Sequence, residues 1–76
     1  TSLYPNPTSN NITVEAKGAK APLTVILRDI TGRSVSEYKI ENPSSFQIEI
    51  AQDSGIYMLE LKDAAGKKTT RKVIKK

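Results

Sequence analysis

The sequence contains no cysteine, no histidine and no tryptophan, and only four of its 76 residues are aromatic. Without cysteine there is no disulfide, no thiolate zinc site and no cysteine nucleophile. Without histidine there is no Ser-His-Asp triad and no imidazole ligand for a metal. No segment approaches the roughly 18 apolar residues of a membrane span, and the first residues are not those of a secretory signal peptide. We therefore expect a domain without catalytic residues, metal or cofactor.

The size and charge of the chain further restrict the class of protein to which it can belong. Seventy-six residues make one small domain, and such a chain buries only about 60% of the surface that its unfolded form exposes. The net charge is +4, but residues 62–76 hold seven basic residues and one acidic residue, whereas residues 1–61 hold five basic and seven acidic residues. A +6 segment thus follows a −2 body. This asymmetry predicts a basic arm, or a terminal address, on a domain with a thin core.

The pattern of side chains predicts an all-β fold. Valine, isoleucine and threonine make up 19 of the 76 residues, and these β-branched types favour strands. Turn residues recur at the spacing of a small sandwich or barrel, about every 8–12 positions. Six segments between turn residues are predicted to be strands, and Ser2–Tyr4 would add a seventh if it joins a sheet. The six are Asn11–Lys17, Leu23–Asp29, Ser34–Glu41, the segment of Phe46, Ile48 and Ile50, Ile56–Lys62 and Lys68–Lys75.

Three details of this pattern make sharper predictions. Segments 23–29 and 56–62 carry apolar residues on both faces, so we expect both to be central strands, and segment 23–29 to be covered on both sides. The lysine-rich segment 68–75 is typical of an edge strand protected from further pairing. In segment 34–41 the parity of Val35 differs from that of Tyr38 and Ile40, and a β-bulge near Ser36 or Glu37 would reconcile them.

The turns have a recognisable chemistry. Asp29 and Asp63 each precede a glycine by three positions, Gly32 and Gly66. This spacing suits a type I turn closed by a glycine with positive φ. We expect Asp29, Asp53 and Asp63 to cap the backbone of their turns. Tyr57, close behind Gly55, is expected to bury its ring and to find a partner for its hydroxyl near the turn.

Several functional readings remain open on composition alone. The dispersed carboxylates lack the clustering of a calcium loop, although a paired-carboxylate hydrolase remains formally open. The basic segment could contact nucleic acid, but no aromatic residue follows Tyr57 to stack on bases. Tyr4, Tyr38, Tyr57 and Phe46 could stack on a sugar, although their dispersion in the sequence favours core positions.

Five short motifs occur in order along the whole chain. They are Tyr4-Pro5-Asn6-Pro7, Asn11-Ile12-Thr13-Val14-Glu15, Asp29-Ile30-Thr31-Gly32-Arg33-Ser34-Val35, Gly55-Ile56-Tyr57 and Lys72-Val73-Ile74-Lys75-Lys76. In this order and spacing the chain resembles the type A C-terminal sorting domain of the type IX secretion system of Gram-negative Bacteroidota. One departure is the turn Gln52-Asp53-Ser54, where the family often has Leu-x-x-Gly.

The resemblance implies an immunoglobulin-like antiparallel β-sandwich of about seven strands. It also implies a single C-terminal sorting domain over residues 1–76, with residues 1–10 as the linker and first-strand region and residues 11–76 as the sandwich. Such a domain belongs to a larger secreted protein, which passes through the periplasm and is directed across the outer membrane by the translocon. A surface protease of the sortase type usually removes the domain, with cleavage expected upstream of or near residue 1. The domain is then neither an enzyme nor a nucleic-acid-binding module.

Within that resemblance, the last strand is the expected contact with the translocon, by edge pairing or by charge complementarity. The residues assigned to this contact are Lys72, Val73, Ile74, Lys75 and Lys76. Gly55 and Tyr57 are expected to set the geometry of the neighbouring strand, and Pro5 and Pro7 to mark the junction with the linker. The alternative is a small adhesive or glycan-binding module attached to a secreted enzyme. A weak homodimer through the edge strands is left open.

Overall fold

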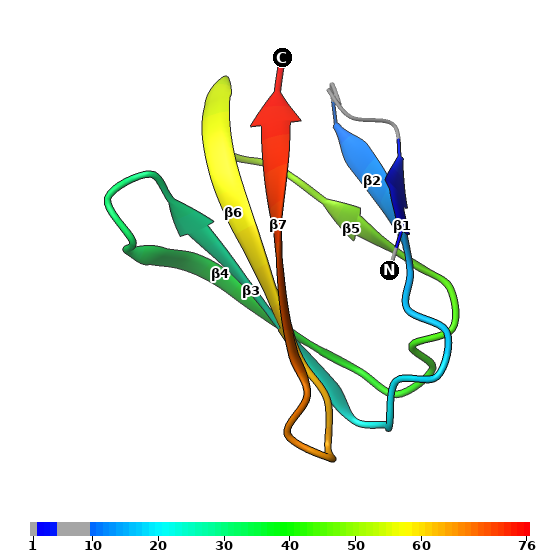
Figure 1. Ribbon diagram of the computed structural model, residues 1–76. Coiled ribbons are helices and arrows are strands. Elements are labelled where there is room, and N and C mark those ends of the chain that lie inside the picture. Colours follow the sequence, from blue (N-terminus) through cyan, green and yellow to red (C-terminus); the bar gives the residue numbers. More distant parts are fainter. Residues whose placement is uncertain (1, 5–9) are drawn as a thin grey trace.

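The chain forms two antiparallel β-sheets with seven strands, as the expected sandwich requires (Figure 1). A computed structural model describes residues 2–4 and 10–76, so Pro5, Asn6 and Pro7 lie outside the described residues. Within them, no helix is long and apolar enough to cross a membrane. The strands are β1 (Ser2–Tyr4), β2 (Asn11–Glu15), β3 (Leu23–Asp29), β4 (Ser34–Ile40), β5 (Phe46–Glu49), β6 (Gly55–Lys62) and β7 (Lys68–Lys75).

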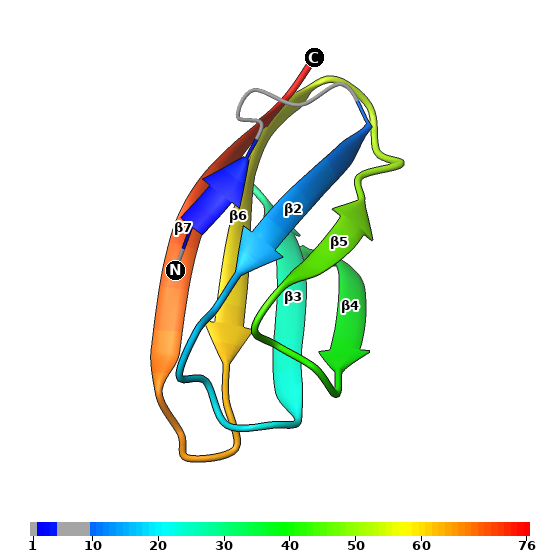
Figure 2. The same cartoon turned by 90° about the vertical axis from the view of Figure 1, so that its right-hand side faces the viewer.

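The strand order places the basic last strand at an edge. One sheet has the order β1-β2-β5 and the other the order β4-β3-β6-β7. Figure 2 shows the smaller sheet lying over the larger one, with β1 on the same side as β7. The predictions that β3 and β6 are central and that β7 is an edge strand are confirmed, and Ser2–Tyr4 does form the seventh strand.

Alternate residues of each sheet meet in the core between the two layers. On β6, every second residue faces inward, which buries Tyr57, Leu59 and Leu61. This alternation is the period-two pattern of strands that are solvated on one face. The other buried apolar residues are Ile12, Val14, Ala16, Leu23, Val25, Leu27, Ile48, Ile50 and Val73.

The outer face of the larger sheet corrects one prediction. Ile26 on β3 and Met58 on β6 point away from the core and are half-buried. In the described residues no second layer covers this face, because the two sheets pack only through their inner faces. The prediction that segment 23–29 is covered on both sides is therefore wrong: neighbouring side chains within the sheet shield Ile26 and Met58 in part.

Two strand details also differ from the predictions, for local reasons. β2 ends at Glu15, two residues earlier than expected, because Ala16 begins a turn in which the Ala19 amide donates to the Ala16 carbonyl at 3.1 Å. The bulge in β4 lies at Val35, since Ser36 pairs with Leu27 and Ser34 pairs with Arg28. It therefore directly follows the β3–β4 turn, and it lets Val35 pack against the core with Tyr38 and Ile40.

Because the core is thin, the loss of a single buried side chain is expected to lower the free energy of unfolding measurably. We expect Leu59→Ala, which truncates a fully buried side chain on central strand β6, to reduce the free energy of unfolding by about 2–5 kcal/mol. Ile56→Ala on the same strand is the matched control, because the Ile56 side chain is 45% exposed and its loss should cost roughly 1 kcal/mol or less. Urea denaturation of the two variants measures the difference. Equal losses would contradict the assignment of faces on β6.

Candidate functional site

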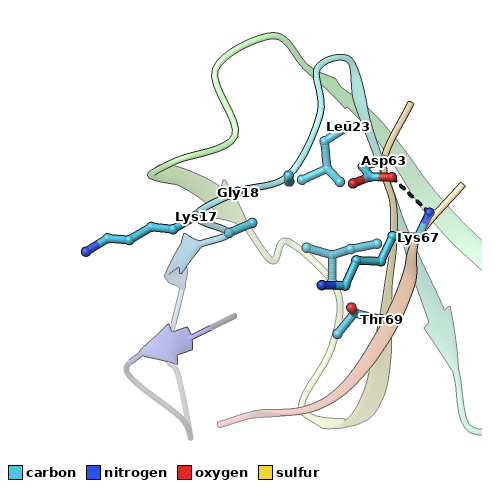
Figure 3. Close-up of a pocket in the computed structure, with 9 residues that line it drawn as sticks. Lys17, Gly18, Leu23, Asp63, Lys67 and Thr69 are labelled. Atoms are coloured by element: carbon cyan, nitrogen blue, oxygen red, sulfur yellow. Dashed lines mark hydrogen bonds between the residues drawn. The ribbon is translucent and has the colours of Figure 1, made fainter. Parts of the chain in front are cut away.

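The turn between β6 and β7 is built around the Asp63 carboxylate, which accepts a hydrogen bond from the Lys67 amide (Figure 3). One oxygen of the buried Asp63 carboxylate accepts hydrogen bonds from the main-chain amides of Ala65 and Lys67, at 3.0 and 2.9 Å. The other accepts from the Lys20 amide at 3.2 Å, and the Ala64 amide donates to the Lys20 carbonyl at 3.0 Å. Asp63 therefore caps its own turn, as predicted, and also ties that turn to the β2–β3 connection, which the sequence did not indicate.

These hydrogen bonds favour the charged form of the carboxyl group. The bond from the Lys67 amide, aided by those from Lys20 and Ala65 and by the Lys67 charge, lowers the pKa of Asp63, while partial burial opposes the shift. The ionised carboxylate is thus part of the folded structure at neutral pH.

The turn between β3 and β4 has the same chemistry but is more exposed. The Thr31 hydroxyl and the Thr31 and Arg33 amides donate to one oxygen of Asp29, at 2.6, 3.0 and 3.0 Å. The Gly32 amide closes the turn on the Asp29 carbonyl at 2.9 Å, and Gly32 has a φ of 90°, which glycine adopts at little cost. The bond from the Thr31 hydroxyl is the main cause of a lowered pKa for Asp29. The capping prediction is confirmed for this turn.

The segment between β5 and β6 follows only part of its prediction. The Tyr57 ring is buried, and its hydroxyl donates to the Asp53 carbonyl at 2.7 Å, as expected for this motif. The contact holds the segment down on the first residues of β6. The Asp53 carboxylate, however, accepts no hydrogen bond from the described residues, so the prediction that it caps the turn is wrong. The Asp53 main-chain carbonyl takes part instead.

Strand pairing brings most of the motif residues to one end of the larger sheet. Asp29 pairs with Tyr57, and Tyr57 pairs with Val73, so these three residues form one row across β3, β6 and β7. Gly55 pairs with Lys75 in the next row. Tyr4 lies instead on β1 in the other sheet, opposite Thr13, where the nearby Glu15 charge raises its pKa.

The two faces of β7 have different surroundings. Val73 is fully buried opposite Tyr57. The half-buried Lys75 has the same parity and donates from Nζ to the main-chain carbonyl oxygens of Ile50 and Gln52, the latter at 3.1 Å. Lys72, Ile74 and Lys76 are exposed to solvent. The five residues assigned to recognition therefore divide into two that hold the fold and three that face outward.

Two hollows lie in the described part of the chain, near opposite ends of β6. One cavity of about 90 Å³ lies beside Asp63, between Leu23, Leu61 and Thr69 (Figure 3), and it has room only for a few water molecules, since ligand pockets usually span about 300–1,000 Å³. A wider hollow of about 400 Å³ lies at the other end of β6, between the β3–β4 turn and Gln52. Its one aromatic residue is Tyr57, whose ring is buried and so cannot stack on a sugar.

Comparison with known proteins settles the family. A family model described as a secretion system C-terminal sorting domain matches residues 2–76. The chain belongs to this family. A search of the curated proteins finds no match. The sorting domain is a C-terminal signal for the type IX secretion system, as the resemblance implied, and the match gives no support to a glycan-binding module.

Membership of this family fixes the coarse function. A sorting domain is part of a larger cargo protein, directs that cargo to the cell surface or the extracellular space, and is not catalytic in itself. In the sorting domain the last strand lies at the edge of the larger sheet, and the basic side chains of Lys72 and Lys76 are exposed to solvent.

The lowered pKa of Asp63 predicts an acid-sensitive domain. The stability that the ionised Asp63 carboxylate contributes is fully present above the unfolded-state pKa of about 3.9. This stability is lost as the pH falls through the lower folded-state pKa of Asp63. We expect Asp63→Asn to lower the urea midpoint at neutral pH and to flatten the fall in stability on the acid side. Asp53→Asn is the matched control, because that carboxylate makes no hydrogen bond with the described residues. Equal urea midpoints and an equal pH dependence in the two variants would contradict the role of the Asp63 carboxylate in stabilising the turn.

The hydrogen bonds of Lys75 predict that replacing this residue destabilises the fold. Lys75→Met keeps the aliphatic length but removes the donor to Ile50 and Gln52, and we expect it to lower the free energy of unfolding by about 1 kcal/mol. Lys76→Met, one position on and exposed, should leave stability within about 0.5 kcal/mol of the parent value. Thermal unfolding followed by circular dichroism separates them, and a neutral Lys75→Met would overturn the assignment.

Proposed function

We propose that β7 is the element of the sorting domain that the translocon reads, and that it is read while folded. The exposed side chains of Lys72, Ile74 and Lys76 would make the contact. The observation that supports this most is the outward placement of these three residues on a strand at the edge of the sheet. A rigid frame suits recognition, because little conformational entropy is then lost on binding.

In this proposal Val73 and Lys75 act through the fold. Val73 fills the core opposite Tyr57, and Lys75 ties β7 to the segment between β5 and β6. Both contacts keep the strand from rotating about its axis, so that the same side chains always face outward. Gly55 and Tyr57 contribute by shaping the start of β6, the strand on which β7 lies.

The remaining steps of the pathway belong to the same proposal. The cargo would cross the periplasm before export, and a surface protease of the sortase type would cleave upstream of or near residue 1. The domain itself would carry no enzyme activity. Its role in the pathway would then end at the cell surface, where it is separated from the cargo.

The proposal is tested with a signal peptide and a fluorescent protein fused ahead of the 76-residue chain, in a host that carries the system. Deletion of Val73–Lys76 is expected to leave the reporter in the periplasm. Replacement of both Lys72 and Lys76 by glutamate should lower the exported fraction about tenfold, because the charge of the contact is reversed while the core is untouched. Surface and periplasmic fluorescence after cell fractionation give the ratio.

The matched control reverses two exposed lysines of the β2–β3 connection, Lys17 and Lys20, which changes the net charge by the same amount. This variant should be exported like the parent. Circular dichroism of each purified domain shows whether it is folded. Delivery of the truncated fusion to the cell surface would contradict the proposal. An equal fall in the exported fraction of the two charge-reversed variants would also contradict it.

A further inference from the structure

Two isoleucines lie side by side on the solvated face of the larger sheet. Ile56 on β6 pairs with Ile74 on β7, and their side chains are 45% and 38% exposed. Residues paired across antiparallel strands have neighbouring side chains on one face, and the half-buried Met58 follows Ile56 by two positions on that face. Single exposed apolar residues are ordinary, but contiguous ones mark interaction sites. We refer to Ile56, Met58 and Ile74 as the isoleucine patch.

The surroundings of the isoleucine patch are cationic. The outer face of the sheet carries five basic residues and two acidic ones, a net charge of +3. Of the acidic residues, Glu60 lies within 3.6 Å of Arg28 and 3.4 Å of Lys68, so its charge is already balanced. Lys72 precedes Ile74 by two positions on the same face. The basic residues are Arg28, Lys39, Lys62, Lys68 and Lys72, and the second acidic one is Glu37.

The charge decides among the surfaces that could cover the patch. A second copy of the chain would bring lysine against lysine, which is unfavourable in a symmetric contact. An anionic lipid surface would accept the lysines, but stable membrane binding needs a larger apolar face, and Glu60 lies in the middle of this one. A protein surface with an apolar centre and acidic side chains around it complements both the isoleucines and the lysines.

We propose that the isoleucine patch is the docking site for such an acidic, apolar-centred protein surface of the export machinery. This rests on the proposed function and deepens it, since recognition then extends from β7 onto β6 and requires the two strands to be paired. The apolar contact would supply affinity, and the lysines would orient the domain. A peptide with the sequence of β7 alone would present only half of the patch.

The test uses the reporter fusion with Ile56 and Ile74 both replaced by threonine. Threonine is also β-branched and favours strands, so the sheet should persist. We expect the exported fraction to fall about tenfold, the size of effect expected when about 1.4 kcal/mol of binding is lost, with an unchanged thermal midpoint. Ile30→Thr is the matched control: Ile30 is 74% exposed on the β3–β4 turn, outside the patch, and its variant should be exported normally.

The outcomes separate this inference from the proposed function. If the parent fusion is not exported, the proposed function fails. If the parent is exported and the double threonine variant is exported equally well, or loses export only in proportion to its unfolding, the docking site is overturned while the sorting role stands. Binding of the parent domain to vesicles of phosphatidylglycerol and phosphatidylcholine, abolished by the double substitution, would overturn a protein partner in favour of lipid. Concentration-dependent dimerisation of the parent domain, abolished by the double substitution, would overturn the partner from the export machinery in favour of a second copy of the chain.

Discussion

The register of β7 against β6 is the constraint on which the rest of the structure depends. With Val73 opposite Tyr57, one set of alternate side chains points inward, where Val73 enters the core, and the other set, which includes Lys72 and Ile74, faces solvent. A slip by one residue would exchange the two sets, because side chains alternate along a strand. Such a slip would drive lysines toward a dry core, which is costly for an unpaired charge. The fold and the outward placement of Lys72 and Ile74 are therefore fixed by the same pairing.

Both ends of β7 are held against such a slip. At its start, Asp63 fixes the tight turn and ties it to the main chain of Lys20. At its end, the Lys75 ammonium group reaches the carbonyls of Ile50 and Gln52. Between these anchors the strand carries few apolar residues, and pairing along β6 supplies its order. A small domain without disulfides thus keeps a highly charged edge strand in one position.

Much of this could be predicted from the sequence because the signals are local. The alternation in β6, the two Asp-x-x-Gly turns and the lysine-rich last strand each predict their structure from a few adjacent residues. The bulge was misplaced, because it depends on how the turn at Asp29 closes and not on parity alone. The bond from Lys20 to Asp63 spans 43 positions, so no local pattern could show it.

Which of residues 72–76 are buried and which face solvent could also not be predicted from the sequence alone. The sequence places Val73 and Lys75 on one face of a strand, but does not tell which face is covered. That depends on the smaller sheet, whose strand β1 is only three residues long. The isoleucine pair was equally hidden, since Ile56 and Ile74 lie 18 positions apart and meet only through the hairpin.

The central claim is that these 76 residues, as a folded sandwich, are sufficient to address a cargo to the cell surface. The most direct measurement compares the surface-exposed fraction of a reporter carrying the chain in a host with the type IX translocon and in the same host lacking it. The account predicts surface delivery in the first host and periplasmic retention in the second. Equal distribution of the reporter in the two hosts would contradict it.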